Sequence, residues 1–184
     1  MKRDHAFLIE LLDTFTSNRV FRQKLKIIDK QNIRGWETWL QIEFSYFLTE
    51  LEDNIEWYRE LRCLPDKRYA AMKNRCSIIP DFVVRKKGWS QNYFLFIEFK
   101  QNASPSDCIK NMFLDLKKIL SIRKNENIDV RSYWCVGFTR SKDIQELKEK
   151  ILKYNDDCYD GYYDIEQYLT IKRIGRTPYS TITF

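Results

Sequence analysis

Apolar residues gather in two short runs near the middle of the chain, at positions 78–84 and 94–99. Each run is rich in Ile, Val and Phe, which predicts a buried strand. The polar segment 85–92 lies between the runs and predicts a turn that lets the two strands pair. A pair of apolar strands is therefore expected at the centre of the fold.

Charged residues interrupt both runs. Asp81 opens the first strand, and Glu98 and Lys100 lie at the end of the second. Residues two apart on a strand share a face, so Glu98 and Lys100 point the same way, and pairing of the strands brings Asp81 close to both. A buried carboxylate is costly unless it is paired or bound to a metal ion. Two carboxylates and an ammonium group at one end of an apolar sheet can hold a divalent cation and activate a water molecule.

Other elements follow from the spacing of apolar residues. Helical spacing predicts helices, and apolar runs predict strands. One helix or a pair of helices is expected over 4–30. Further helices are expected at 36–51, 105–120 and 143–154, and strands at 56–63, 133–138, 168–174 and 179–184. Ser104-Pro105-Ser106-Asp107 has the spacing of a capping box with proline at the first helical position, which predicts a helix start. No repeat or linker divides the chain, so a single domain is expected over 1–184.

Pro80-Asp81 followed by Glu98-Phe99-Lys100 resembles the motif of the PD-(D/E)XK nuclease superfamily. A second Pro-Asp pair, Pro65-Asp66, lies in a polar segment with no apolar run after it. The resemblance covers residues 36–139. It implies an α/β fold with a restriction-endonuclease-like core, in the order helix-strand-strand-strand-helix-strand, with a mixed central sheet flanked by helices. Residues 1–35 would then be a helical N-terminal extension, and 140–184 a C-terminal helix and hairpin.

The resemblance also implies a metal site and a reaction. Asp81 and Glu98, with the main-chain carbonyl of Phe99, would hold Mg²⁺, for which Mn²⁺ could substitute. Lys100 would orient the attacking water and stabilise the transition state. The implied activity is hydrolysis of phosphodiester bonds in nucleic acid, with DNA favoured over RNA. Members of this superfamily serve in restriction, repair, recombination and phage defence, so the biological role does not follow from the fold.

The helix predicted over 36–51 supplies a further candidate ligand. Family members often contribute a glutamate from the helix that precedes the first core strand. Glu43 and Glu37 both lie near the apolar stripe of this helix. Glu43 is the preferred ligand and Glu37 the alternative. The ordinary interpretation is that a helical glutamate simply faces solvent.

Charge distribution points to a polyanionic partner. The chain has a net charge of +6, and basic residues cluster on either side of Asp81. Such a rim around an acidic centre suits nucleic acid, although lysine-rich turns also occur merely because they are soluble. The candidate nucleic-acid-binding residues are Lys67, Arg68, Lys73, Arg75, Arg85, Lys86 and Lys87.

Composition argues against several classes of protein. Five widely spaced cysteines and one histidine do not predict a zinc site. The chain has no phosphate-binding loop of the nucleotide-hydrolase kind. No apolar stretch is long enough to span a membrane, and the first residues have no signal-peptide pattern. A cytoplasmic protein with reduced thiols and no membrane partner is expected.

Two alternatives to a nuclease stay open. The first is a catalytically silent nuclease fold that serves as an assembly subunit, and the second is an unrelated nucleic-acid-binding module. The sequence also leaves open a homodimer, formed by the N-terminal helices or the C-terminal hairpin, or a partner protein that supplies targeting.

Overall fold

The computed structural model describes residues 1–65, 77–120, 122–124 and 128–184. The helices are α1 (Lys2–Ser17), α2 (Arg19–Lys30), α3 (Glu37–Thr49), α4 (Pro105–Ile119) and α5 (Ile144–Tyr159). The strands are β1 (Ile55–Arg59), β2 (Leu64–Pro65), β3 (Phe82–Lys86), β4 (Tyr93–Asn102), β5 (Ile122–Lys124), β6 (Asp129–Arg140), β7 (Thr170–Arg173) and β8 (Tyr179–Thr183).

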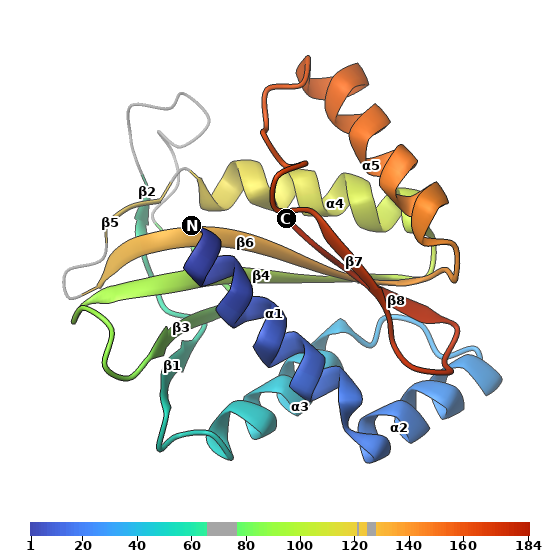
Figure 1. Cartoon of the computed structure of the whole chain (residues 1–184), viewed down its shortest axis with the longest axis horizontal. Helices are drawn as coiled ribbons and strands as arrows, with labels where there is room; N and C mark the ends of the chain where they lie inside the picture. Colours follow the sequence, from blue (N-terminus) through green and yellow to red (C-terminus); the bar gives the residue numbers. More distant parts are fainter. Residues whose placement is uncertain (66–76, 121, 125–127) are drawn as a thin grey trace.

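Six strands form one mixed sheet in the order β1-β3-β4-β6-β8-β7 (Figure 1). The β3–β4 pair is antiparallel, as the polar turn between the two apolar runs predicts. Strands β4 and β6 are parallel and are joined through α4, while β7 and β8 form an antiparallel hairpin that pairs with β6. The predicted α/β class with a mixed sheet flanked by helices is thereby confirmed.

Helices cover both faces of this sheet. Helices α1, α2 and α3 pack on one face, and α4 and α5 pack on the other (Figure 1). Along β4, Leu95 and Ile97 point to the first face, whereas Phe94 and Phe96 point to the second. Because side chains alternate along a strand, Glu98 and Lys100 lie on the α4 face.

Local capping sets two of the helix boundaries. The helical pattern over 4–30 is divided at Asn18, whose side chain accepts hydrogen bonds from the backbone N–H groups of Val20 and Phe21 at the start of α2. Ser104 caps α4 as the sequence predicts, since its hydroxyl accepts from the N–H of Asp107 at 3.4 Å. In the described residues, no helix has both the length and the apolar character needed to cross a lipid bilayer.

Candidate functional site

The site lies where β4 extends beyond its neighbour β3. The pairing of β3 with β4 begins at Phe82 opposite Ile97, and β4 continues to Asn102. In the described part of the chain, no strand pairs with β4 on that side beyond Ile97. The backbone groups of this edge must therefore find other partners, because an unpaired buried N–H is costly.

Carboxylates take the place of the missing strand. The N–H of Phe99 donates to Asp81 Oδ2 at 2.7 Å. Two residues further along, the N–H of Gln101 donates to Glu37 Oε2 at 2.7 Å. Asp81 comes from the residue just before β3, and Glu37 from the first turn of α3. The strand edge thus brings together two acidic residues that are far apart in the sequence.

Pro80 explains why the edge stays open at this point. Continuing the β3–β4 register places Pro80 opposite Phe99, and proline has no N–H to donate to the carbonyl of Phe99. The N–H and C=O of one strand residue point to the same edge. The Phe99 carbonyl therefore points to the side from which Asp81 approaches.

Five charged side chains at the site form a row of ion pairs in which acidic and basic residues alternate. Lys100 Nζ lies 3.2 Å from Glu37 Oε1 and 2.9 Å from Asp115 Oδ2. Lys118 Nζ lies 3.2 Å from Asp115 Oδ1 and 2.8 Å from Glu98 Oε1. Glu37 comes from α3, Asp115 and Lys118 come from α4, and Glu98 and Lys100 come from β4. The network therefore connects helices from both faces of the sheet to β4.

Asp81 and Glu98 lie together at the buried end of this network. Burial raises the pKa of Asp81, and the hydrogen bond from the Phe99 N–H opposes that rise. Burial and then the charge of Asp81 raise the pKa of Glu98 to about 8, although Lys118 acts in the opposite direction. Only 4% of the Glu98 side chain is exposed. The two carboxylates are therefore an acidic pair that lacks sufficient compensating charge.

Lys100 is held in its charged form. Burial alone would lower the pKa of Lys100, but the carboxylates of Asp115 and Glu37 outweigh that effect and raise it. The site as a whole has four carboxylates and two ammonium groups. Acidic groups therefore outnumber basic groups at the site.

The structure places Glu37, and not the preferred Glu43, beside Lys100. Glu43 Oε1 lies 2.6 Å from Lys24 Nζ, on the side of α3 that faces α2. Six positions separate the two glutamates, and at 3.6 residues per turn their side chains point about 120° apart. Glu37, the alternative, contacts Lys100, whereas Glu43 is not brought to the site.

Asp115 and Lys118 were not predicted from the sequence. They lie on α4, beside a buried apolar stripe that includes Met112, Leu116 and Ile119. Charged residues that flank such a stripe usually face solvent. The spacing of residues along α4 does not distinguish Asp115 and Lys118 from solvent-exposed charged residues, because their contacts with the site depend on how α4 lies across β4.

The basic residues predicted to bind nucleic acid fall into different groups. Lys67, Arg68, Lys73 and Arg75 lie outside the described residues. Lys86, the last residue of β3, and Lys87, in the turn that follows, are exposed, and both lie at the end of β3 away from Asp81.

Arg85 has a structural role instead. Its guanidinium pairs with Glu56 on β1, donates to the carbonyl of Trp89 at 3.1 Å and lies 5.3 Å from the ring centroid of Phe94. Only 13% of its side chain is exposed. Arg85 therefore joins β1, β3 and the following turn, and it is not available as a simple phosphate contact.

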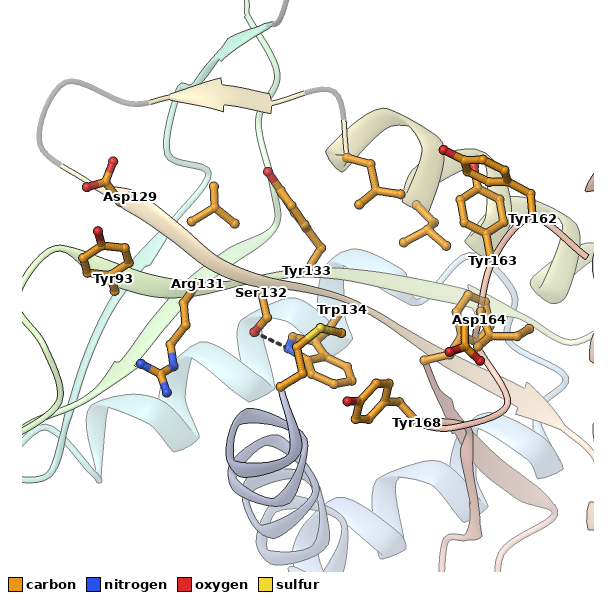
Figure 2. A pocket seen from close by; sticks show the side chains of 16 residues that line it. Tyr93, Asp129, Arg131, Ser132, Tyr133, Trp134, Tyr162, Tyr163, Asp164 and Tyr168 are labelled. Carbon is orange, nitrogen blue, oxygen red and sulfur yellow. Dashed lines mark hydrogen bonds between the residues drawn. The ribbon is translucent and has the colours of Figure 1, made fainter.

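A separate cavity of about 740 Å³ lies beside the first half of β6 (Figure 2). Its lining is rich in tyrosine, with Tyr93, Tyr133, Tyr162, Tyr163 and Tyr168. Trp134 Nε1 donates to Ser132 Oγ at 2.8 Å within it. Among the described residues that line this cavity, none belongs to the network around Lys100. The cavity and the charged site are thus separate features.

Within the described ranges, no group of three or more His, Cys, Asp or Glu side chains is arranged to hold a metal ion. In the charged network, Lys100 and Lys118 lie between the carboxylates, and Asp81 and Glu98 are the two carboxylates in direct contact. Comparison of the chain with family models, curated proteins and solved structures finds no match. The function is accordingly argued from the site itself.

Proposed function

We propose that this chain is a metal-dependent nuclease of the PD-(D/E)XK kind that hydrolyses phosphodiester bonds, with DNA as the favoured substrate. The observation that carries the proposal is the meeting of Asp81, Glu98 and Lys100 at the open end of β4. With the separate two-stranded β2–β5 sheet set aside, the elements around them, α3-β1-β3-β4-α4-β6, follow the order helix-strand-strand-strand-helix-strand. This order is the one expected of a restriction-endonuclease-like core.

The donor atoms suit a hard divalent cation. Asp81 and Glu98 offer carboxylate oxygens, and the Phe99 carbonyl points to the same edge, which together match the oxygen ligands that Mg²⁺ and Mn²⁺ accept. Burial and then the charge of Asp81 raise the pKa of Glu98, and a bound cation would counter both effects. Lys118 contacts Glu98, and a cation held by Glu98 would compete with that contact.

Each residue then has a defined task. A bound Mg²⁺ would supply a Lewis acid that lowers the pKa of a water molecule. Asp81 and Glu98 bind the ion. Lys100 keeps its proton, because its pKa is raised by Asp115 and Glu37, so it serves as a fixed positive charge that stabilises the phosphate in the transition state. Glu37 and Asp115 position the Lys100 ammonium group.

Long-range electrostatics also support a polyanionic substrate. The net charge of +6 attracts nucleic acid before any specific contact forms. Exposed Lys86 and Lys87 lie at the end of β3 away from Asp81, so they would add positive charge along a long substrate and not at the site itself.

A silent nuclease fold is the second candidate, and one observation favours it. Lys118 and Lys100 already neutralise part of the acidic cluster by direct ion pairs, as they would in a purely structural network. This alternative predicts that the melting temperature does not respond to Mg²⁺ and that no substrate is cut.

The decisive experiment is cleavage of labelled single-stranded DNA, duplex DNA and RNA, with Mg²⁺, Mn²⁺ or a chelator. We expect metal-dependent cutting, which Asp81→Asn abolishes by reducing both metal affinity and rate. Lys100→Ala should lower the rate about 100-fold with little change in metal affinity, because it removes one transition-state contact. Lys150→Ala is a matched control, since Lys150 is an ion-paired lysine on α5. A Lys100→Ala protein that cleaves as fast as the parent would show that the assignment is wrong.

A further inference from the structure

Large apolar side chains protrude from α2, from α3 and from the loop between the two helices. They are between 47% and 66% exposed, and they are Val20, Ile27, Ile33, Ile42 and Tyr46. Val20 and Ile27 are seven positions apart on α2, and Ile42 and Tyr46 are four apart on α3, so each pair lies on one side of its helix. We call this surface the α2–α3 face. Clustered exposed apolar side chains of this kind mark interaction sites.

One half of the α2–α3 face is an acidic hollow. It has a volume of about 580 Å³, and Val20, Ile42 and Tyr46 are among the residues that line it. Glu43 and Glu50 lie on its lining as well. This half therefore combines a protruding tyrosine with negative charge.

The other half is a basic hollow. Its volume is about 400 Å³, and its apolar lining includes Ile27, Ile33 and Trp39. Arg34 and Lys24 supply its charge. Lys24 also lines the acidic hollow and pairs with Glu43 at 2.6 Å, so the two hollows meet at this ion pair. Because Lys24 and Glu43 neutralise each other, the charge that remains on the lining is Glu50 at one end of the α2–α3 face and Arg34 at the other.

A surface with this pattern is complementary to itself. In a twofold-symmetric dimer the same patch faces its own copy in reverse, which brings the acidic hollow of one protomer over the basic hollow of the other. Aromatic side chains that enter an apolar hollow supply most of the binding energy at such interfaces.

We propose that the α2–α3 face binds a second copy of this chain as a twofold-symmetric dimer. Tyr46 of each protomer enters the hollow lined by Ile27 and Ile33 of its partner, and Glu50 of each faces Arg34 of the other. A basic protein gains from this arrangement, because the negative end of the face offsets repulsion between two chains of equal charge.

The dimer does not depend on the proposed nuclease activity. Ile42 and Tyr46 lie five and nine positions after Glu37, which places them on a different side of α3 from the residue that contacts Lys100. Loss of cleavage by site variants would thus leave the dimer intact, and loss of the dimer would leave the carboxylates of the site in place.

Charge exchange between two variants provides the sharpest test. Sedimentation equilibrium of the parent should give a dimer, and Glu50→Lys or Arg34→Glu alone should each weaken it by roughly tenfold or more, because like charges then oppose each other twice. An equimolar mixture of the two variants should restore the dimer, since both contacts become attractive in the mixed pair. Glu50 and Arg34 line different hollows of one chain, so contacts within a chain do not account for this rescue.

A second pair of variants tests the apolar contact. Tyr46→Glu should give a monomer with unchanged circular dichroism, because Tyr46 is 66% exposed, and its melting temperature should fall only by the stabilisation that dimer formation gave the parent. Leu114→Glu is the control, as Leu114 is a 50% exposed apolar residue on α4, and it should remain dimeric. The proposal would be overturned if the parent is monomeric up to about 100 μM. It would also be overturned if the mixture of Glu50→Lys and Arg34→Glu dimerises no more strongly than either variant alone, or if Tyr46→Glu is dimeric.

Discussion

Replacement of Glu98 by glutamine should stabilise the protein near neutral pH. Glu98 is buried beside Asp81, and its pKa is raised to about 8 from an ordinary value of 4.5. Glutamine has nearly the same shape and never ionises. If the carboxylates are kept for binding a cation, their close approach costs stability when no cation is present, and the variant removes that cost.

The sign and size of this difference in the free energy of unfolding follow from proton linkage. Because the folded pKa of Glu98 lies above the unfolded value, the folded state binds the proton more tightly, and the stabilisation is complete below pH 4.5. It is lost as the pH rises toward 8. At 1.36 kcal/mol per pH unit, the parent should lose about 3 kcal/mol relative to Glu98→Gln between pH 4.5 and pH 7.

Urea denaturation of both proteins at several pH values, with a chelator present, measures this difference. Any effect of the substitution that does not depend on pH cancels when the two pH values are compared. A Glu98→Gln protein that is less stable than the parent by the same amount at every pH would refute the reasoning. Glu98 would then be an ordinary ion-pair partner of Lys118.

Three further predictions concern the site and its support. Glu37→Gln should reduce the cleavage rate at least about tenfold more than Glu43→Gln in the same assay, because only Glu37 contacts Lys100; equal losses would contradict the placement of α3. Saturating Mg²⁺ should raise the melting temperature of the parent by several degrees but not that of Asp81→Asn, as measured by differential scanning fluorimetry, and equal shifts would argue against Asp81 as a ligand. Gly137→Ala should cost about 1–3 kcal/mol in urea denaturation, because an added Cβ would clash with Met112 Sδ; an unchanged midpoint would show that the Met112 side chain or α4 moves away freely.

The strands that carry the site could be predicted because their apolar runs are strong. The pairing of residues 82–84 with residues 95–97 follows from two runs separated by a polar turn. The start of β3 could not be placed from the pattern, since Ile78 is apolar but pairs only in an isolated bridge with Cys63. Hydrophobicity alone does not show that Pro80 ends the ladder.

The sequence narrowed the glutamate that α3 contributes to the site to two positions, but it could not decide between them. Glu37 and Glu43 both lie next to the apolar stripe of α3 in the sequence, and the choice depends on the rotation of α3 against the sheet and on the position of α2. Lys24 on α2 pairs with Glu43. The periodicity of apolar residues does not show that these two helices lie side by side, so this contact could not be predicted from it. The same limit applies to Asp115 and Lys118, which reach β4 only because α4 crosses it in one particular position.

The carboxylates at the β4 edge have a consequence for solubility. An unprotected sheet edge presents N–H groups that can pair with a strand of another molecule, which is a route to aggregation, and charged side chains on an edge block that route. Asp81 and Glu37 occupy the N–H groups of Phe99 and Gln101. Removing both acidic residues would therefore expose this part of the strand edge. We expect the double alanine variant to accumulate in inclusion bodies, while each single asparagine or glutamine variant, which keeps a hydrogen-bond acceptor, stays soluble.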